Sequence, residues 1–515
     1  MTEIQLALLL IAIVIVITAV SRGLGASTPI AMVLGGLALS FVPGIPKVEL
    51  PPELVFFGFL PPLLFAGGYF TSLREFRANL RPILLLAFGL VLFTAALVAV
   101  VAHIFIPSLG WAGAFALGAI VAPPDEIAAT AIFQRLGVPR RIVSILEGES
   151  LVNDATALVI YRFAVAAAAA GAFSLLDASV AFVVVLAGGV AVGMLVGYAL
   201  DRLADRVRDT PTAVAITLVA PYAAYLPAEA IGVSGVLAAV VCGLWSRHAM
   251  RHTSSDTRVV GAAVWQIWLF LLNGLVFFLL GLQLPTVLKN VDLNPITLGA
   301  AIGVVGAVTV GRFLWVYPAT YVPRLIPKIR RKDPNPPWQG VAVVAWSGLR
   351  GVVSLAAALA LPQFFPDRDL IIFFTFVVIL ATLVGQGLTL PFLIRALGLA
   401  PERDTEHAEA HARALTADAA LERIDDLEAE YPGHKQLIDA LRSQYQNRSD
   451  HAEQHHGDEP GAAEQERIDH TQIRRELIEA ERRAAFDLHE RGVIGDDILR
   501  RIERDLDLEE LRTEA

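Results

Sequence analysis

The stretch GAIVAPPDEIAAT, residues 118–130, places two prolines and two acids inside an apolar run that is otherwise long enough to cross a lipid bilayer. Pro123 and Pro124 supply no amide donors and disfavour helical backbone in the residues before them. We therefore predict a helix that breaks here and resumes afterwards. Because an ionisable side chain in hydrocarbon is costly, Asp125 needs a reason to be there. An ion site is one explanation, and a simple proline kink with an acid in a wet crevice is the other.

Composition around this stretch indicates a membrane protein. Apolar residues make up 55% of the 515 residues and charged residues 18%, whereas soluble domains carry about 25% charged residues. Apolar runs follow one another up to about Leu397, each long enough to cross a bilayer as a helix. Beyond that point the chain is strongly acidic and holds eight of the eleven histidines. We predict a transmembrane domain over residues 1–397 and a helical, cytoplasmic, regulatory tail over residues 398–515.

The apolar runs predict an all-α membrane protein with about thirteen transmembrane helices. We place these spans at residues 4–21, 29–45, 53–70, 82–106, 111–134, 142–170, 177–200, 211–228, 231–246, 260–284, 295–321, 338–362 and 370–397. Loops after odd-numbered spans hold eighteen Lys and Arg residues, and loops after even-numbered spans hold three. Because positive loops stay on the cytoplasmic side, we expect a multi-pass protein of the cytoplasmic membrane, with its N-terminus outside and its tail inside. Glu3 stands where a signal peptide would be basic, so the first run is expected to remain as a span.

The tail contains two predicted helical stretches, at about residues 405–445 and 464–512. In the second stretch, apolar residues recur at roughly helical spacing. A polar patch with His451, His455 and His456 separates the two. A solvated helical domain with a small dimerising stripe is the simpler interpretation of the tail, and pH sensing by these histidines is the alternative.

A second acidic stretch, ILEGESLVNDATALVIY at residues 145–161, reaches the same depth from the opposite side. Asp154 lies about 18 Å into its span and Asp125 about 21 Å into the preceding one, at 1.5 Å per residue. Ser150 lies four residues before Asp154 and shares its helix face, and Asn153 adjoins it in sequence. Carboxylate, hydroxyl and amide oxygens suit an alkali cation rather than a transition metal. Since a carboxylate also takes up a proton, cation and proton can compete for Asp154.

Two arginines also fall deep inside predicted spans. Arg312 and Glu149 lie at similar depths from the cytoplasmic side, so we predict a buried structural ion pair between them. Arg350 lies near the middle of its span within WSGLRGVVSL, and the flanking Gly348 and Gly351 suggest a second helix break.

The two predicted breaks are related if spans 1–6 and 8–13 form inverted repeats. Spans five and twelve are then symmetry partners that run in opposite directions. We expect Asp125 to lie beside exposed N–H groups at one break and Arg350 beside exposed C=O groups at the other. Each charge would then compensate the helix ends around it.

The chain resembles the bacterial Na+/H+ exchanger branch of the monovalent cation:proton antiporter family, which is related to animal sodium–proton exchangers. The matching segments run in the family's order and cover residues 1 to about 397: FLPPLLFAGGYF, VAPPDEIAATAI, EGESLVNDATALV, RFLWVYPATY, WSGLRGVVSLAAALALP and LVGQGLTLPFL. The resemblance implies a homodimer in which a core domain moves against a dimerising panel. It implies Asp154 as the carrier of cation and proton with Ser150 as a neighbouring ligand. Asn153 before that acid is the pattern of electroneutral exchange.

The resemblance also assigns Asp125 and Arg350 to the broken crossing helices, and Glu149 with Arg312 to the structural pair. The sequence departs from the family at two positions. Many bacterial members have an acid after LPPLLF, where this chain has Ala66, and Glu126 stands where a small residue or proline is usual. These departures bear on which ion is carried.

We therefore predict a secondary active antiporter that exchanges Na+, or else K+ or Li+, for protons by alternating access, with no cofactor and no enzymatic activity. A K+/H+ antiporter is the nearest alternative. An anion transporter is disfavoured because the midplane carries two carboxylates against one arginine, and a non-transporting ion sensor is favoured only by Ala66. The sequence contains no GxxxxGK[ST] loop, and no nucleic-acid partner is expected. Cys242 is the single cysteine, so neither an intrachain disulfide nor a thiolate metal site is expected.

Overall fold

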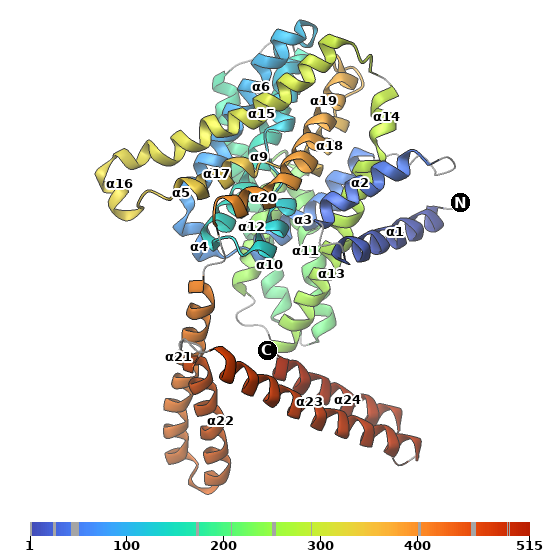
Figure 1. The fold of residues 1–515 in the computed structure, drawn as a ribbon. Helices are drawn as coiled ribbons and strands as arrows, with labels where there is room; N and C mark the ends of the chain where they lie inside the picture. Colours follow the sequence, from blue (N-terminus) through green and yellow to red (C-terminus); the bar gives the residue numbers. More distant parts are fainter. Residues whose placement is uncertain are drawn as a thin grey trace. The chain divides into compact units, whose positions relative to one another are not determined.

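The computed structural model describes residues 3–23, 27–42, 51–170, 175–207, 209–249, 254–289, 291–399, 403–454, 460–491, 493 and 495–514. Every regular element within these ranges is helical (Figure 1), which confirms the all-α prediction for this part of the chain. The chain divides into two compact units, Met1–Pro401 and Glu402–Ala515.

The first half of the larger unit contains the following helices: α1 (Glu3–Gly23), α2 (Thr28–Ser40), a π-helical turn (Leu54–Phe59) leading into α3 (Leu60–Phe70), α4 (Leu73–Ala78), α5 (Leu80–Leu84), a second π-helical turn (Leu85–Leu90) leading into α6 (Val91–Phe105), α7 (Gly110–Val121), α8 (Glu126–Leu136) and α9 (Arg140–Ala170).

The second half contains α10 (Leu175–Ala204), α11 (Thr210–Ala230), α12 (Gly235–Ala249), α13 (Ser255–Leu282), α14 (Leu284–Lys289), α15 (Pro295–Tyr321), α16 (Pro327–Lys332), α17 (Trp338–Trp346), α18 (Val352–Leu359), α19 (Arg368–Leu380), a third π-helical turn (Ala381–Gln386) and α20 (Gly387–Ala396).

Each predicted span falls on one helix or on two helices in succession. By length and composition, seven helical segments of the described chain are able to cross a membrane: Leu80–Phe105, Arg140–Ala169, Ala178–Ala204, Thr210–Ala230, Ser255–Leu288, Pro295–Leu325 and Arg368–Ala396. The predicted start of the ninth span at residue 231 lies four residues too early. Helix α12 begins only at Gly235, because the chain turns at Gly232, whose φ is +78°. Residues 43–45 of the second predicted span lie outside the described ranges.

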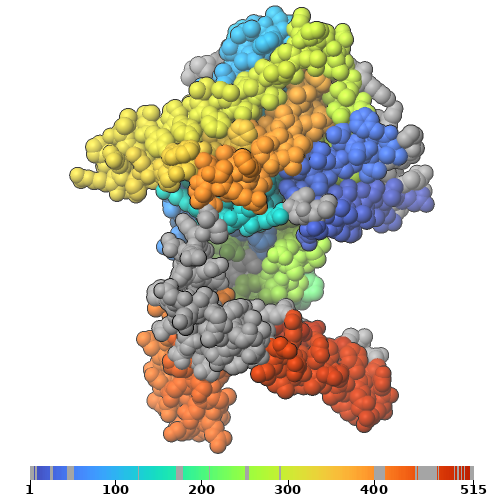
Figure 2. Space-filling model, in the orientation of Figure 1, coloured from blue at the N-terminus to red at the C-terminus, as the bar shows by residue number. Residues whose placement is uncertain are grey.

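Many outward-facing side chains on these helices are large and apolar, as lipid contact favours. Figure 2 shows α1, α2 and α15 on one face of the larger unit. Leu8 on α1 is 63% exposed and Ile302 on α15 is 74% exposed. In water such exposure would be unfavourable, whereas hydrocarbon imposes no such penalty.

The larger unit contains two groups of helices. We call α1–α3 with α10–α13 the panel group, and α6–α9 with α15 and α17–α20 the crossing group. Within the panel group, α2 packs on α13 and α3 packs on α12. Within the crossing group, α7 packs on α6, α9 and α18, and α15 packs on α6 and α17.

Glycines let the panel helices approach backbone to backbone. A Cβ on Gly36 would lie 2.2 Å from the carbonyl oxygen of Phe278, and a Cβ on Gly281 would lie 2.2 Å from that of Val33, so α2 and α13 meet closely. Gly68 and Gly243 make the equivalent approach between α3 and α12, at 2.2 Å each. Small residues at such contacts are typical of membrane helices. Helices α2, α3, α12 and α13 correspond to predicted spans two, three, nine and ten. Inverted repeats of spans 1–6 and 8–13 would relate span two to span nine and span three to span ten, so a contact between spans two and ten would be repeated between spans nine and three.

One buried ion pair joins α9 to α15 in the crossing group. Arg312 donates to both carboxylate oxygens of Glu149, at 2.7 and 2.8 Å, and its Nε donates to the carbonyl of Val344 at 3.1 Å. Both side chains are only 1% exposed. The bidentate geometry satisfies two charges that would each be costly alone.

A second charge cluster lies outside the predicted spans, at Asp333 between α16 and α17. Arg81 and Arg141 each donate to its carboxylate at 2.6 Å, and Arg324 donates at 2.7 Å. Partial burial acts to raise the pKa of Asp333, but the hydrogen bonds and charges of Arg141 and Arg324 outweigh it, so the pKa lies below its usual range. The carboxylate thereby ties the α16–α17 loop to the starts of α5 and α9.

The tail unit consists of two helix pairs, α21 (Arg403–Glu430) with α22 (Lys435–Gln454) and α23 (Pro460–Glu490) with α24 (Asp496–Glu514). Each predicted stretch is therefore two helices, because the chain turns at Pro432–His434 and again near Gly495. Arg442 joins the first pair through Asp425 and Glu428, and Arg482 joins the second through Asp507 and Glu510. His455 and His456 lie outside the described residues, as does the side chain of His451.

Replacing Glu149 with alanine should destabilise the protein by roughly 3–5 kcal/mol, because Arg312 would remain buried without its partner. The double substitution Glu149→Gln with Arg312→Gln should recover part of that loss. Thermal unfolding of the detergent-solubilised protein measures both. Glu53→Ala, at an exposed position of the same unit, is the matched control and should change stability by less than about 0.5 kcal/mol. No recovery in the double variant would mean that the two residues do not act as partners.

Asp333→Asn should destabilise the protein by about 1 kcal/mol at neutral pH, the scale of a partly exposed charge network. Because the folded-state pKa of Asp333 is lowered, its contribution is complete above the unfolded value of about 4 and is lost as pH falls through the folded value. The gap in melting temperature between wild type and variant should therefore close in acid. Asp369→Asn, which loses only a 3.7 Å contact with Arg368, is the control. A gap that stays constant down to low pH would contradict this assignment.

Candidate functional site

The two predicted breaks meet each other in the interior of the larger unit. Residues 122–125 separate α7 from α8, and residues 347–351 separate α17 from α18. The backbone N–H of Asp125 donates to the carbonyl of Leu349 at 2.6 Å, so the two interrupted chains are bonded directly. Prolines cause the first break, and glycines at 348 and 351 permit the second.

Asp125 lies at the N-terminal ends of two helices. Its Oδ1 accepts from the backbone N–H of Ile127 at 2.9 Å, which caps α8. Its other oxygen lies against Gly351, where a Cβ would come within 1.6 Å of it, so the start of α18 can approach only because residue 351 is glycine. A negative charge at two helix N-termini matches the helix dipoles.

Arg350 lies at the opposite helix ends. Its Nε donates to the carbonyl of Val121 at 2.9 Å and its Nη2 to that of Ala122 at 3.1 Å, which satisfies the C-terminal end of α7. Its Nη1 donates to the carbonyl of Gly348 at the end of α17. The backbone N–H of Arg350 donates to Oγ1 of Thr382 at 3.0 Å. The guanidinium is buried, so these carbonyls take up its donors.

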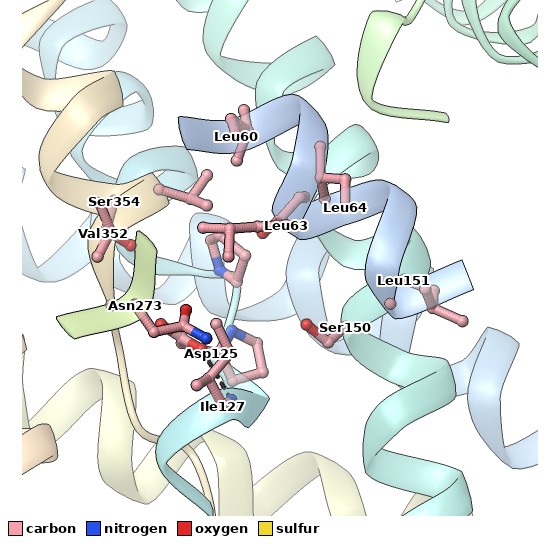
Figure 3. Close-up of a pocket in the computed structure, with 16 residues that line it drawn as sticks. Leu60, Leu63, Leu64, Asp125, Ile127, Ser150, Leu151, Asn273, Val352 and Ser354 are labelled. Atoms are coloured by element: carbon pink, nitrogen blue, oxygen red, sulfur yellow. Dashed lines mark hydrogen bonds between the residues drawn. The ribbon is translucent and has the colours of Figure 1, made fainter. Parts of the chain in front are cut away.

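A cavity of about 70 Å³ lies beside this crossing, large enough for a few water-sized ligands at roughly 15 Å³ each. Five polar side chains line it: Asp125, Ser150, Asp154, Asn273 and Ser354 (Figure 3). Its remaining lining residues are Leu60, Leu63, Leu64, Gly67, Pro123, Pro124, Ile127, Leu151, Gly351, Val352 and Val353. No Lys or Arg is among these described lining residues. A cavity with two carboxylates and neutral oxygens is suited to a desolvated cation.

The structure brings three of the four predicted ion-site residues into this cavity. Asp154, which is 6% exposed, Ser150 on the same helix α9, and Asp125 all line it. Asn153 does not, because its amide turns away and donates from Nδ2 to the carbonyl of Pro124 at 3.0 Å. Asn153 thus links α9 to the break before α8. Its Oδ1 has no hydrogen-bond partner in the described structure.

The structure describes the side chain at one of the two positions where the sequence departs from the family. Ala66 is buried in a cluster with Tyr69 and Trp265 and does not line the cavity. The face of α3 toward the cavity carries Leu60, Leu63, Leu64 and Gly67 instead. The side chain of Glu126 lies outside the described part of the chain.

Sequence reasoning missed Asn273 on α13 and Ser354 on α18. A signal for Asn273 was available, since it is the single polar residue in the run Ile267–Leu282. A lone amide in the middle of an apolar span requires a partner or a ligand. Ser354 follows the second break by three residues, and small hydroxyl residues are too common in membrane helices to single it out.

Comparisons with known proteins identify the family. A family model described as sodium/hydrogen exchanger, transmembrane, matches residues 5–396. An uncharacterized Na+/H+ exchanger of Mycobacterium tuberculosis is 33% identical over 522 residues, covering 98% of this chain and 95% of its own. A sodium, potassium, lithium and rubidium/H+ antiporter of Bacillus subtilis is 37% identical over 386 residues, covering 71% of this chain and 57% of its own.

Among solved structures, the sodium proton antiporter MjNhaP1 of Methanocaldococcus jannaschii has the same fold, with a TM-score of 0.61. It is 18% identical, and the match covers 77% of this chain and 99% of that one. The family match spans nearly all of the larger unit, and these relatives are secondary transporters rather than enzymes. The chain is therefore a multi-pass membrane protein that belongs to the sodium/hydrogen exchanger family.

Proposed function

We propose that this protein is a secondary active antiporter that exchanges Na+ for protons across the cytoplasmic membrane, with Asp154 as the group for which cation and proton compete. The observation that carries the proposal is the position of Asp154, a nearly buried carboxylate in a small cavity that also holds Asp125 and Ser150. An ionised carboxylate in such a place is costly, so the group needs either a bound cation beside it or a proton on it. Exchange follows if each occupant excludes the other.

Na+ is the first choice of cation, with K+ or Li+ as alternatives. The relatives carry names that include Na+ alone and a set of four alkali ions, so the family tolerates more than one size. Carboxylate and hydroxyl oxygens at Asp154 and Ser150 are ligands for any of these ions. The second candidate function is therefore K+/H+ antiport on the same site.

An anion carrier fits this site poorly. The described lining of the cavity holds two carboxylates and no basic side chain. Arg350, the basic group at the same crossing, directs its guanidinium donors to backbone carbonyls. A non-transporting sensor gains no support from Ala66, since that residue lies away from the cavity.

Alternating access in this proposal is a movement of the crossing group against the panel group. The cavity has walls from both groups: α3 and α13 on one side, and α8, α9 and α18 on the other. We propose that the panel groups of two chains form a homodimer. We also propose thirteen spans with the N-terminus outside, and a cytoplasmic tail over residues 398–515 that regulates exchange. No cofactor is needed, because the chemistry is the binding and release of ions.

Asp154→Asn should reduce Na+-dependent proton flux in proteoliposomes to background, because an amide holds neither the charge for the cation nor the proton. The variant should still fold, since Asn is nearly isosteric with Asp. Asp205→Asn, at an exposed turn after α10, is the matched control and should retain wild-type flux. Substantial Na+-dependent flux in Asp154→Asn would show that another group carries the ions.

Exchange should be electroneutral, because Asp154 takes either one cation or one proton and Asn153 before it cannot ionise. Asp125 keeps one charge state in this proposal, held by the helix ends around it. The test is Na+-driven proton flux in liposomes with and without valinomycin and K+ to clamp the membrane potential. Equal rates support one-for-one exchange. A rate that follows the imposed potential would contradict it, and Glu126→Ala would then be the first variant to make.

A further inference from the structure

An unpaired amide carbonyl lies at the cavity on the panel side. Asn273 comes from the middle of α13, and its Oδ1 is buried with no hydrogen-bond partner among the described residues. Buried acceptors are nearly always paired, because leaving one unpaired is unfavourable. Asn273 also lines the cavity that contains Asp125 and Asp154, and Figure 3 shows its amide pointing toward Asp125.

We infer that the side-chain carbonyl of Asn273 is a ligand of the transported cation. This inference rests on the proposed function and assigns the site a ligand from the panel group. The other described panel residues at the cavity are Leu60, Leu63, Leu64 and Gly67, none of which has a polar side chain. Among the described lining residues of the cavity, Asn273 is thus the one polar side chain from the panel group.

The chemistry of the site favours a cation over a hydrogen-bond donor as the partner of Asn273. The other polar side chains lining the cavity are two carboxylates and two hydroxyls. An ionised carboxylate only accepts hydrogen bonds, and neither serine hydroxyl bonds the amide oxygen in the described structure, so no lining side chain satisfies that oxygen. An alkali cation can satisfy the amide oxygen and the carboxylates at the same time, since all are hard oxygen ligands.

The position of Asn273 on α13 gives the cation a role in joining the two helix groups. Asp154 lies on α9 of the crossing group, so an ion held by both residues spans the boundary along which the groups would move. A proton on Asp154 does not require a ligand from α13. Loss of the Asn273 carbonyl should therefore weaken cation binding and leave proton binding unchanged.

The test compares the full-length wild type, Asn273→Leu and Asn273→Asp in proteoliposomes, with Na+ as the probe at several pH values. Asn273→Leu should raise the KM for Na+ about tenfold, as expected for the loss of one buried polar contact, with the maximal rate within about twofold. The increase should persist at alkaline pH, where protons compete little. Asn273→Asp keeps an oxygen ligand, so its KM at alkaline pH should equal or fall below that of the wild type.

Gln386→Met is the matched control, because Gln386 also has a buried, unpaired side-chain carbonyl but does not line the cavity. It should leave the KM for Na+ unchanged. Stabilisation by Na+ gives a second readout that needs no transport, since a ligand that binds the folded protein raises its melting temperature. Asn273→Leu should need about ten times more Na+ for the same shift. If Asn273→Leu does not fold, the KM for Na+ and the Na+-dependent shift in melting temperature are measured on Asn273→Asp and Asn273→Ser instead.

Three outcomes would overturn the inference, and a fourth would overturn only the proposed function. A wild-type KM in Asn273→Leu would show that the carbonyl is no ligand. A raised KM in both Asn273→Leu and Asn273→Asp would show that the amide acts as a hydrogen-bond donor to Asp125. An equal rise in Gln386→Met would show a general packing effect. Absence of Na+-dependent flux in the wild type would instead sink the proposed function, and the Na+-dependent melting shift would still decide the role of Asn273.

Discussion

The contact between the two interrupted helices is the constraint on which the rest of the larger unit depends. Where α7 and α17 stop, backbone carbonyls lose their partners, and where α8 and α18 start, N–H groups lose theirs. In hydrocarbon no water can replace those partners. Asp125 takes up the N–H side and Arg350 the C=O side, and the bond from Asp125 N–H to Leu349 C=O fixes the two breaks together.

The arrangement explains why polar residues collect at this one depth. Asn153 donates to the carbonyl of Pro124, so α9 is tied to the break before α8. Glu149, one turn away on α9, is held by Arg312 of α15. The helix that carries Asp154 is thus bonded on both sides within the crossing group. A carboxylate held in this way would keep its position in the proposed movement of the crossing group.

The boundary between the two helix groups is held more weakly. Arg162 on α9 and Glu229 on α11 form an ion pair across it at 2.5 Å, with side chains 43% and 23% exposed. Pairs this exposed are worth little, so this one offers little resistance to sliding. Inside the panel group, by contrast, glycines bring α2 to α13 and α3 to α12 at backbone contact. Among the described residues, close packing inside each group together with this exposed ion pair between them is the pattern expected of two rigid bodies.

The sequence by itself determined the helical class, and it predicted the spans and the depth of each charge. It could do so because apolar run length is set by bilayer thickness, and depth follows from counting residues along a helix. Depth also predicted that Glu149 would face Arg312, whereas the prolines before Asp125 and the glycines around Arg350 predicted the two breaks. Tertiary structure decided the azimuth of each side chain: Asn153 turns to the Pro124 carbonyl, Ala66 packs away from the cavity, and Asn273 faces it. Depth follows from the number of residues along one helix, so the sequence alone gives it. The direction in which a side chain points depends on how helices distant in sequence pack against one another.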